Sequence, residues 1–213
     1  MDKRFQILLL LIPALFALFA VKGEYGFFSR AGVSLSCAVI VWVTSKYQTK
    51  WWVVVGLLVS VVGDWFMVNR NNNPDFFLYG ICFFFLAHVC FLLFCLKNGR
   101  INRWLLVFVL TGYVAFFFLV LRPAITQPTL LVAVFAYLLV SCLSLATAAG
   151  LRLSKIATWI FTAGITLFVF SDTIIALSEF ASYRTLNFLI LPTYFTSHGV
   201  ITLALMMFLA DGE

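Results

Sequence analysis

The stretch WWVVVGLLVSVVGDWFMV, residues 51–68, decides the class of fold. It is apolar almost throughout, and it is long enough to cross the hydrocarbon core of a bilayer as one helix, which takes about 20 residues. Its exception is one carboxylate, Asp64, directly after Gly63. A carboxylate inside a membrane span costs roughly 2.5–3.5 kcal/mol on insertion scales. A protein that keeps Asp64 in such a span therefore either pairs it or uses it.

The composition of the whole chain also indicates a membrane protein. Of 213 residues, 64% are hydrophobic and 10% are charged, and the mean hydropathy is +1.09. Soluble domains typically carry about 25% charged residues, so a water-soluble globular fold is excluded. We predict an all-α fold, a polytopic membrane protein with a bundle of eight transmembrane helices, forming a single integral membrane domain over residues 1–213. The predicted spans are residues 5–21, 30–46, 51–68, 76–96, 104–121, 129–150, 155–178 and 185–209.

The basic residues predict how these spans are oriented. The net charge is +6, and nine of the 14 basic residues fall at span ends on the side of the two termini. These nine are Lys3, Arg4, Lys46, Lys50, Lys97, Arg100, Arg103, Arg152 and Lys155, against Lys22, Arg30, Arg70, Arg122 and Arg184 on the other side. Because short cytoplasmic loops carry an excess of Lys and Arg, both termini are predicted to be cytoplasmic. We expect a multi-pass protein of a bacterial cytoplasmic membrane.

The same residues bear on partners and cofactors. No basic patch with interleaved aromatic residues lies outside the spans, so we expect membrane lipids as contacts, no nucleic acid, and no particular protein partner. Five cysteines lie in apolar spans without a CxxC pair, which is typical of small buried hydrophobic residues. The two histidines are far apart in sequence and make a poor metal-ligand pattern. We expect no metal and no cofactor.

Two acidic residues, Asp64 and Asp172, lie well inside predicted spans. Their spans run in the same direction, and each carboxylate lies roughly 6–10 Å below the non-cytoplasmic surface at about 1.5 Å per residue. No Lys or Arg is expected inside the membrane to neutralise them. Burial of an unpaired carboxylate favours its protonated form, so one protonated and one ionised Asp would form an acid/base pair.

Small and polar residues repeat at helical spacing beside both aspartates. The repeats are Gly56, Ser60 and Asp64; Gly164, Phe168, Ser171 and Asp172; and Tyr194, His198 and Thr202, with His88 near the middle of residues 76–96. Residues three or four apart share one face of a helix, so these stripes are expected to converge on an interior cavity. Each Tyr, Ser or His alone is more often an interhelical hydrogen-bonding group than a catalytic one, whereas an intramembrane Asp indicates function.

Several short motifs, in this order, resemble those of the YhhN-like lysoplasmalogenase family. They are Gly63-Asp64-Trp65-Phe66; Phe77-Leu78-Tyr79-Gly80 followed by Phe84 and His88; the segment GITLFVFSDTIIA at residues 164–176; and Tyr194 in the last span. Arg30 lies where the family tends to place a basic residue at the start of its second span. The chain departs from the family at Phe91, often Tyr there, and at His198, often Gln.

The resemblance implies hydrolysis of the alkenyl ether bond of a lysoplasmalogen, a lysophospholipid substrate. The products would be a fatty aldehyde and a glycerophosphoethanolamine or glycerophosphocholine. Asp64 and Asp172 would be the catalytic pair, with Arg30 and Tyr79 as candidates for the phosphate headgroup. The remaining candidates for substrate binding are His88, Ser171, Tyr194 and His198.

Three other functions stay open at this point. A proton-coupled transporter also keeps carboxylates in the membrane, and it would carry a solute on a pH gradient. A structural membrane protein would use the aspartates only to bond helices together. An intramembrane aspartyl protease with a GxGD element would need Gly where this chain has Val61.

Overall fold

The computed structural model describes residues 8–71 and 73–207, and in those ranges the elements are all helices. The helices are α2 (Leu11–Val21), α3 (Gly26–Thr44), α4 (Lys50–Val68), α5 (Pro74–Asn98), α6 (Arg103–Phe116), α7 (Pro128–Ala148), α8 (Lys155–Phe180) and α9 (Ile190–Met206). A π-helical turn η1 (Phe117–Leu121) extends α6, and a 3-10 turn η2 (Asn187–Leu189) precedes α9.

Seven described helices are long and apolar enough to cross a membrane, which indicates an integral multi-pass membrane protein. They match seven of the predicted spans, with ends that differ by a few residues. The predicted span at 5–21 differs more, because α2 has 11 described residues. At about 1.5 Å per residue, that helix is shorter than the ~30 Å hydrocarbon core. Residues 5–7 of this span, and the predicted topology residues Lys3 and Arg4, lie outside the described residues, so a bundle of eight spanning helices is not confirmed.

Local signals in the loops begin the long helices. Pro74 occupies the start of α5, where its missing N–H costs nothing, and the Asn73 side-chain oxygen accepts a hydrogen bond of 2.9 Å from the Asp75 backbone N–H. Ser154 caps α8 in the same way, through a 3.3 Å bond from the Ala157 backbone N–H. These caps fix where α5 and α8 begin, and therefore the depth of the polar residues they carry.

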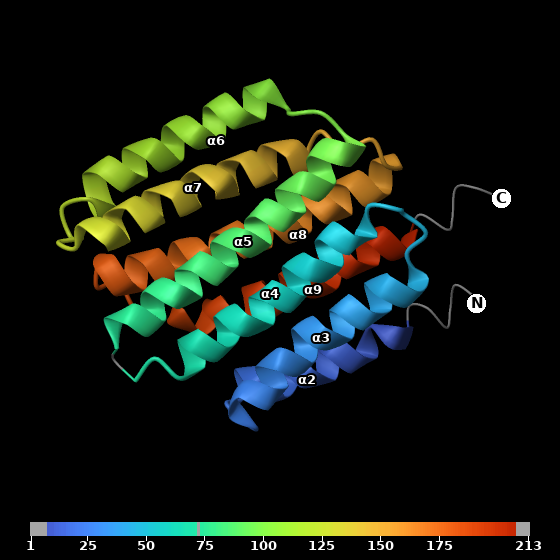
Figure 1. Cartoon of the computed structure of the whole chain (residues 1–213), viewed down its shortest axis with the longest axis horizontal. Coiled ribbons are helices and arrows are strands. Elements are labelled where there is room, and N and C mark those ends of the chain that lie inside the picture. Colours follow the sequence, from blue (N-terminus) through green and yellow to red (C-terminus); the bar gives the residue numbers. More distant parts are fainter. Residues whose placement is uncertain (1–7, 72, 208–213) are drawn as a thin grey trace.

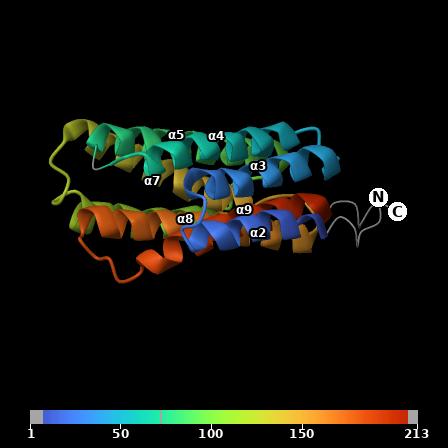
Figure 2. The same cartoon turned by 90° about the horizontal axis from the view of Figure 1, so that it is seen from below.

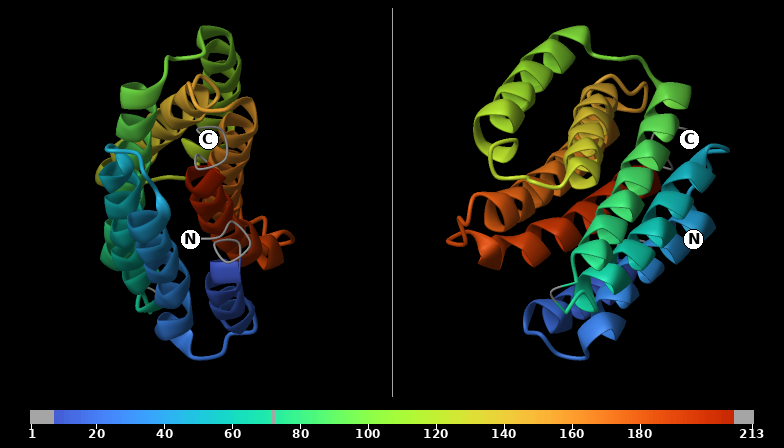
Figure 3. Two further views of the ribbon diagram at one scale, coloured as in Figure 1. Left: turned by 90° about the vertical axis from the view of Figure 1, so that its right-hand side faces the viewer. Right: turned by 60° about the vertical axis from the view of Figure 1, so that its left-hand side comes forward.

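The helices form two layers, as Figure 2 shows. One layer holds α3, α4 and α5, the other holds α2, α8 and α9, and α7 packs against both α5 and α8. Helix α6 lies at the edge of the bundle (Figure 1), and none of its residues is buried. The two views of Figure 3 show the closest pairs, α4 beside α5 and α8 beside α9.

Glycines allow these pairs to approach closely. A Cβ atom at Gly63 would lie 2.9 Å from Cε1 of Phe84, and one at Gly164 would lie 2.6 Å from Cγ1 of Ile201. Small residues at helix contacts are typical of membrane bundles, where close packing rather than hydrophobic burial holds helices together. The pairing sets α4 against α5 at Asp64, and α8 against α9 near Asp172.

The path of the chain places both aspartates at one end of the bundle. Helix α2 begins and α9 ends at the right-hand end in Figure 1, and α4 and α8 both run away from that end. Asp64 lies one turn before the end of α4, and Asp172 lies two turns before the end of α8. Both aspartates therefore lie near one end of the bundle, and the start of α2 lies at the other end.

Candidate active site

Asp64 and Asp172 line one cavity of about 280 Å³, which we call the main cavity. Its mouth is marked by Arg70 and Glu179, whose side chains are 37% and 30% exposed, and its floor by Asp64, which is 3% exposed. Arg30, one turn inside α3, also lines it, so the expectation that no Lys or Arg lies inside the membrane near the aspartates is wrong, because α3 begins at Gly26 rather than at residue 30. The structure thus places both carboxylates in one cavity. Their equal depth and the shared direction of their spans predicted this.

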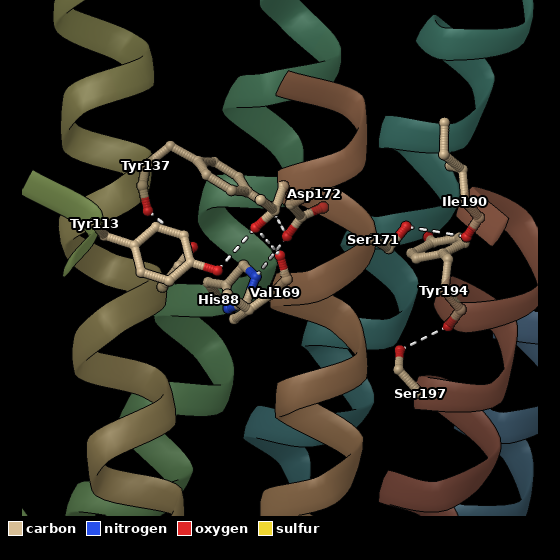
Figure 4. A network of polar contacts seen from close by, with 11 residues as sticks. His88, Tyr113, Tyr137, Val169, Ser171, Asp172, Ile190, Tyr194 and Ser197 are labelled. Carbon is tan, nitrogen blue, oxygen red and sulfur yellow. Dashed lines mark hydrogen bonds and ion pairs between the residues drawn. The ribbon is translucent and has the colours of Figure 1, made fainter. Parts of the chain in front are cut away.

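Asp172 is held by two side chains from other helices. The Tyr137 hydroxyl on α7 donates a 2.6 Å hydrogen bond to Oδ2 of Asp172. Nε2 of His88 on α5 lies 3.2 Å from the same oxygen (Figure 4). Two groups on one oxygen fix the rotamer of the carboxylate.

Asp64 has a simpler set of contacts. The Tyr194 hydroxyl on α9 donates a 3.1 Å hydrogen bond to Oδ2 of Asp64. Ser60, one turn earlier on the same face of α4, donates instead to the Gly56 carbonyl at 3.0 Å. Each aspartate is therefore bonded by a tyrosine from a helix other than its own, but only Asp172 has a histidine as well.

The two histidines lie beside the main cavity and do not line it. His88 and His198 are fully buried on either side of Phe168, with ring centroids 4.5 Å and 5.6 Å from that ring. Ser34 Oγ lies 3.0 Å from Nδ1 of His198. The structure places His88 against Asp172, and His198 where it bonds α3 to α9, rather than on the wall of the main cavity.

Of the other four predicted binding residues, three line the main cavity and one does not. Arg30, Ser171 and Tyr194 line the main cavity. The Ser171 hydroxyl donates a 3.0 Å bond to the Ile190 carbonyl and so ties α8 to the start of α9 (Figure 4). Tyr79 does not line the cavity, because its side chain is 48% exposed and its ring packs on Phe66 with centroids 5.4 Å apart.

The physical reason for the position of Tyr79 is the rotation along α5. Gly80 faces α4, where an added Cβ would lie 2.9 Å from Sδ of Met67. Adjacent residues on a helix point about 100° apart, so Tyr79 is turned away from the side of α5 that carries His88.

The sequence interpretation missed Tyr137. This residue stands in the span PTLLVAVFAYLLVSCLSLATA, and its hydroxyl makes the shortest contact to either aspartate. The available signal was a polar stripe, since Ser141 and Ser144 follow Tyr137 at helical spacing. Next to it, Tyr113 on α6 bonds Thr173 on α8 at 2.8 Å, which extends the polar network across α6, α7 and α8 (Figure 4).

No cluster of three or more His, Cys, Asp or Glu side chains able to hold a metal ion occurs in the part of the chain that the structure describes. The polar groups of the cavity are three carboxylates, two guanidinium groups, the Asn187 amide and hydroxyls, and one of the carboxylates, Glu179, is paired to Arg70 at 2.8 Å. Such a set can donate and accept protons and bind an anion.

Comparison with protein families shows to which family the chain belongs. A model of the YhhN family matches residues 25–205. The chain belongs to the YhhN family. The match covers most of the chain and includes every residue named here at the main cavity. Comparison with curated proteins and with solved structures gives no match.

Proposed function

We propose that this YhhN family protein is a membrane hydrolase that cleaves the vinyl ether bond of lysoplasmalogens. The products are a fatty aldehyde and glycerophosphoethanolamine or glycerophosphocholine. The observation that carries the proposal is the meeting of Asp64 and Asp172 in one cavity that also holds Arg30. The resemblance of the aspartate motifs to those of lysoplasmalogenases supplies the substrate class.

Two carboxylates suit the chemistry of a vinyl ether. A protonated carboxyl group transfers its proton to the carbon β to the ether oxygen, which leaves an oxocarbenium ion. Water adds to that ion and gives its proton to the second carboxylate. The resulting hemiacetal breaks at its ether C–O bond as the hydroxyl proton moves to the leaving oxygen, which releases aldehyde and alcohol. One water is consumed, and the two carboxyl groups exchange protons with solvent between cycles.

The contacts favour different roles for the two residues. Asp172 accepts a hydrogen bond from Tyr137 and has Nε2 of His88 3.2 Å from the same oxygen, so its position is the more firmly fixed, and we assign it to the oxocarbenium ion and the attacking water. Asp64 lies on the floor of the cavity with one hydroxyl donor. A buried carboxyl group with so few donors is held more easily as the neutral acid, and we assign it to proton donation.

Arg30 is the best group for the phosphate of the headgroup. Arg70 is already paired with Glu179, whereas Arg30 makes no ion pair within residues 8–71 and 73–207. A guanidinium group binds phosphate through two parallel hydrogen bonds. A headgroup at Arg30 would hold the vinyl ether in the same cavity as the two aspartates.

The test is aldehyde release from alkenyl lysophospholipids by the protein in lipid vesicles. We expect Asp64→Asn and Asp172→Asn each to lower the rate by a factor of about 10² or more, since general acid–base groups contribute that much. Asp75→Asn is the matched control, because Asp75 is exposed at the start of α5 and does not line the cavity. Full activity in either cavity variant would refute the mechanism. Activity only on another lysolipid would refute the substrate, and solute flux driven by a pH gradient without aldehyde release would favour a transporter.

A further inference from the structure

Two small apolar pockets end on Asp172, and the first of them also shares Met67, Phe84 and Ile175 with the wall of the main cavity. The first, of about 60 Å³, lies between α5, α7 and α8 and includes Phe77, Ile81 and Phe180. The second, of about 50 Å³, lies between α6, α7 and α8 and includes Phe116 and Leu121. We call them the α5 pocket and the α6 pocket.

The two pockets share one wall. Val134, Tyr137, Asp172 and Ala176 line both of them, so Tyr137 separates the pockets while its hydroxyl holds the carboxylate. Asp172 is the charged residue in each lining, and the remaining side chains are mainly aliphatic or aromatic. Asp172 therefore stands where a charged cavity and two apolar pockets meet.

This arrangement matches the two ends of an amphiphile. A headgroup with a phosphate belongs with Arg30 in the main cavity, whereas a hydrocarbon chain stays out of water in an apolar pocket and in the surrounding lipid. The α6 pocket also leads toward the edge of the bundle, because no residue of α6 itself is buried. A chain that starts at Asp172 can thus continue between α6 and α8 toward the surrounding lipid.

We propose that the hydrocarbon chain of the substrate leaves Asp172 along α7 through the α6 pocket, and that Val134 and Ala176, which line it, set which chains are accepted. This proposal rests on the proposed function and adds the chain-binding part of the same site. At about 50 Å³, the α6 pocket holds only the first carbons of an unbranched chain beside Asp172, and it leaves no room for a branch near the reacting bond. The bond to be cleaved then lies between the headgroup and the pockets, next to both carboxylates.

The first test narrows both pockets at once. Ala176→Leu adds three carbons one turn from Asp172, and we expect kcat/KM for a straight-chain alkenyl lysolipid to fall about ten- to hundredfold. Ala163→Leu is the matched control, because it makes the same change on the exposed side of α8. We expect this control to keep the wild-type rate. Equal rates for Ala176→Leu and wild type would overturn the proposal.

The second test widens the pockets, so it does not depend on a loss of activity. Val134→Ala removes two methyl groups from the shared wall, and we expect the rate ratio of a methyl-branched to a straight chain to rise about tenfold. The branch is placed on the carbon next to the vinyl group. An unchanged ratio would contradict a role for Val134 in chain selection.

A binding measurement separates this proposal from the hydrolase proposal. A saturated 1-O-alkyl lysophosphoethanolamine with a diazirine on its chain cannot be hydrolysed, and it labels residues near the chain on illumination. We expect label on α7 and α8 peptides that contain Val134 and Ala176, with labelling at least about fivefold lower in Ala176→Leu. Such labelling in a protein that releases no aldehyde would refute the hydrolase proposal but support the proposed binding site for the hydrocarbon chain. Label confined to the groove between α2 and α9, near Pro13 and Phe195, would overturn the chain site.

Discussion

At the scale of single residues, we expect the clearest effect on activity from Tyr137, whose hydroxyl bonds Asp172. The Tyr137 hydroxyl lies 2.6 Å from Asp172 Oδ2, and removing a hydrogen bond to a charged group costs about 1.5–3 kcal/mol. Tyr137→Phe keeps the ring that separates the two pockets. We therefore expect kcat to fall about ten- to hundredfold, with KM nearly unchanged, because the hydroxyl positions the carboxylate rather than the lipid.

Tyr79→Phe is the matched control for this change. It removes a hydroxyl from an exposed ring that does not line the main cavity, and we expect the wild-type kcat and KM. A fall in kcat of the same size in both variants would show that the assay reports membrane packing. A rise in KM alone for Tyr137→Phe would assign Tyr137 to lipid binding instead of to Asp172.

Arg30 is expected to affect binding more than chemistry. Arg30→Gln keeps a polar but shorter side chain and removes the charge, so KM for a phosphate-bearing lysolipid should rise about tenfold with a smaller change in kcat. Arg30→Lys restores the charge without the paired donors and should recover part of the loss. Steady-state rates over a range of lipid mole fractions in the vesicle measure both constants. An unchanged KM in Arg30→Gln would show that Arg30 does not bind the headgroup.

At the scale of helices, the contact of α8 with α9 sets the geometry of the site. A Cβ at Gly164 would lie 2.6 Å from Ile201 Cγ1 and 3.1 Å from the Ile201 backbone nitrogen, which cannot move without moving α9. We expect Gly164→Ala to destabilise the protein by about 1–3 kcal/mol, as overpacking does, and to lower its thermal midpoint. Because α8 carries Asp172 and α9 carries Tyr194, activity should fall with stability.

The control for this prediction lies on α9. Gly199 has no atom within 4 Å of its ideal Cβ position, so Gly199→Ala meets no clash and gains helix propensity. We expect its thermal midpoint to equal or exceed that of the wild-type protein. Equal midpoints for both alanine variants in the same detergent would show that the close approach at Gly164 does not matter for stability.

The same scale shows what the sequence predicts and what it does not. Blocks of apolar residues set the long spans, and the shared depth of Asp64 and Asp172 predicts their meeting. The rotation of each span is less determined, because a span that is apolar on all sides carries little signal for which side faces inward. For that reason the sequence predicts Tyr79 near the headgroup, whereas the structure places it outside the main cavity. For the same reason the sequence does not single out Tyr137. The partner of His88 likewise depends on α5 packing beside α7 and α8, which no pattern within α5 encodes.

At the scale of the whole molecule, the order of the helices keeps all the charges of the site at one end. Helices α4 and α8 run in the same direction, so their last turns bring Asp64 and Asp172 to that end together with Arg70 and Glu179 (Figure 1). The start of α2 and the end of α9 lie at the other end. The orientation of the protein in the membrane therefore decides from which side the headgroup reaches the cavity.

The distribution of basic residues leads us to propose that the main cavity opens on the non-cytoplasmic side, and cysteine labelling tests this. Asn187 is exposed and lines the mouth, whereas Lys155 is exposed at the start of α8, at the other end of the bundle. In intact cells we expect a membrane-impermeant maleimide to label Asn187→Cys and to label Lys155→Cys only after the cells are opened. The wild-type protein gives the background, because its cysteines lie within helices rather than in loops. The reverse pattern would invert the orientation, leaving the two carboxylates in one cavity but turning its mouth, and the lipid it receives, to the cytoplasmic leaflet.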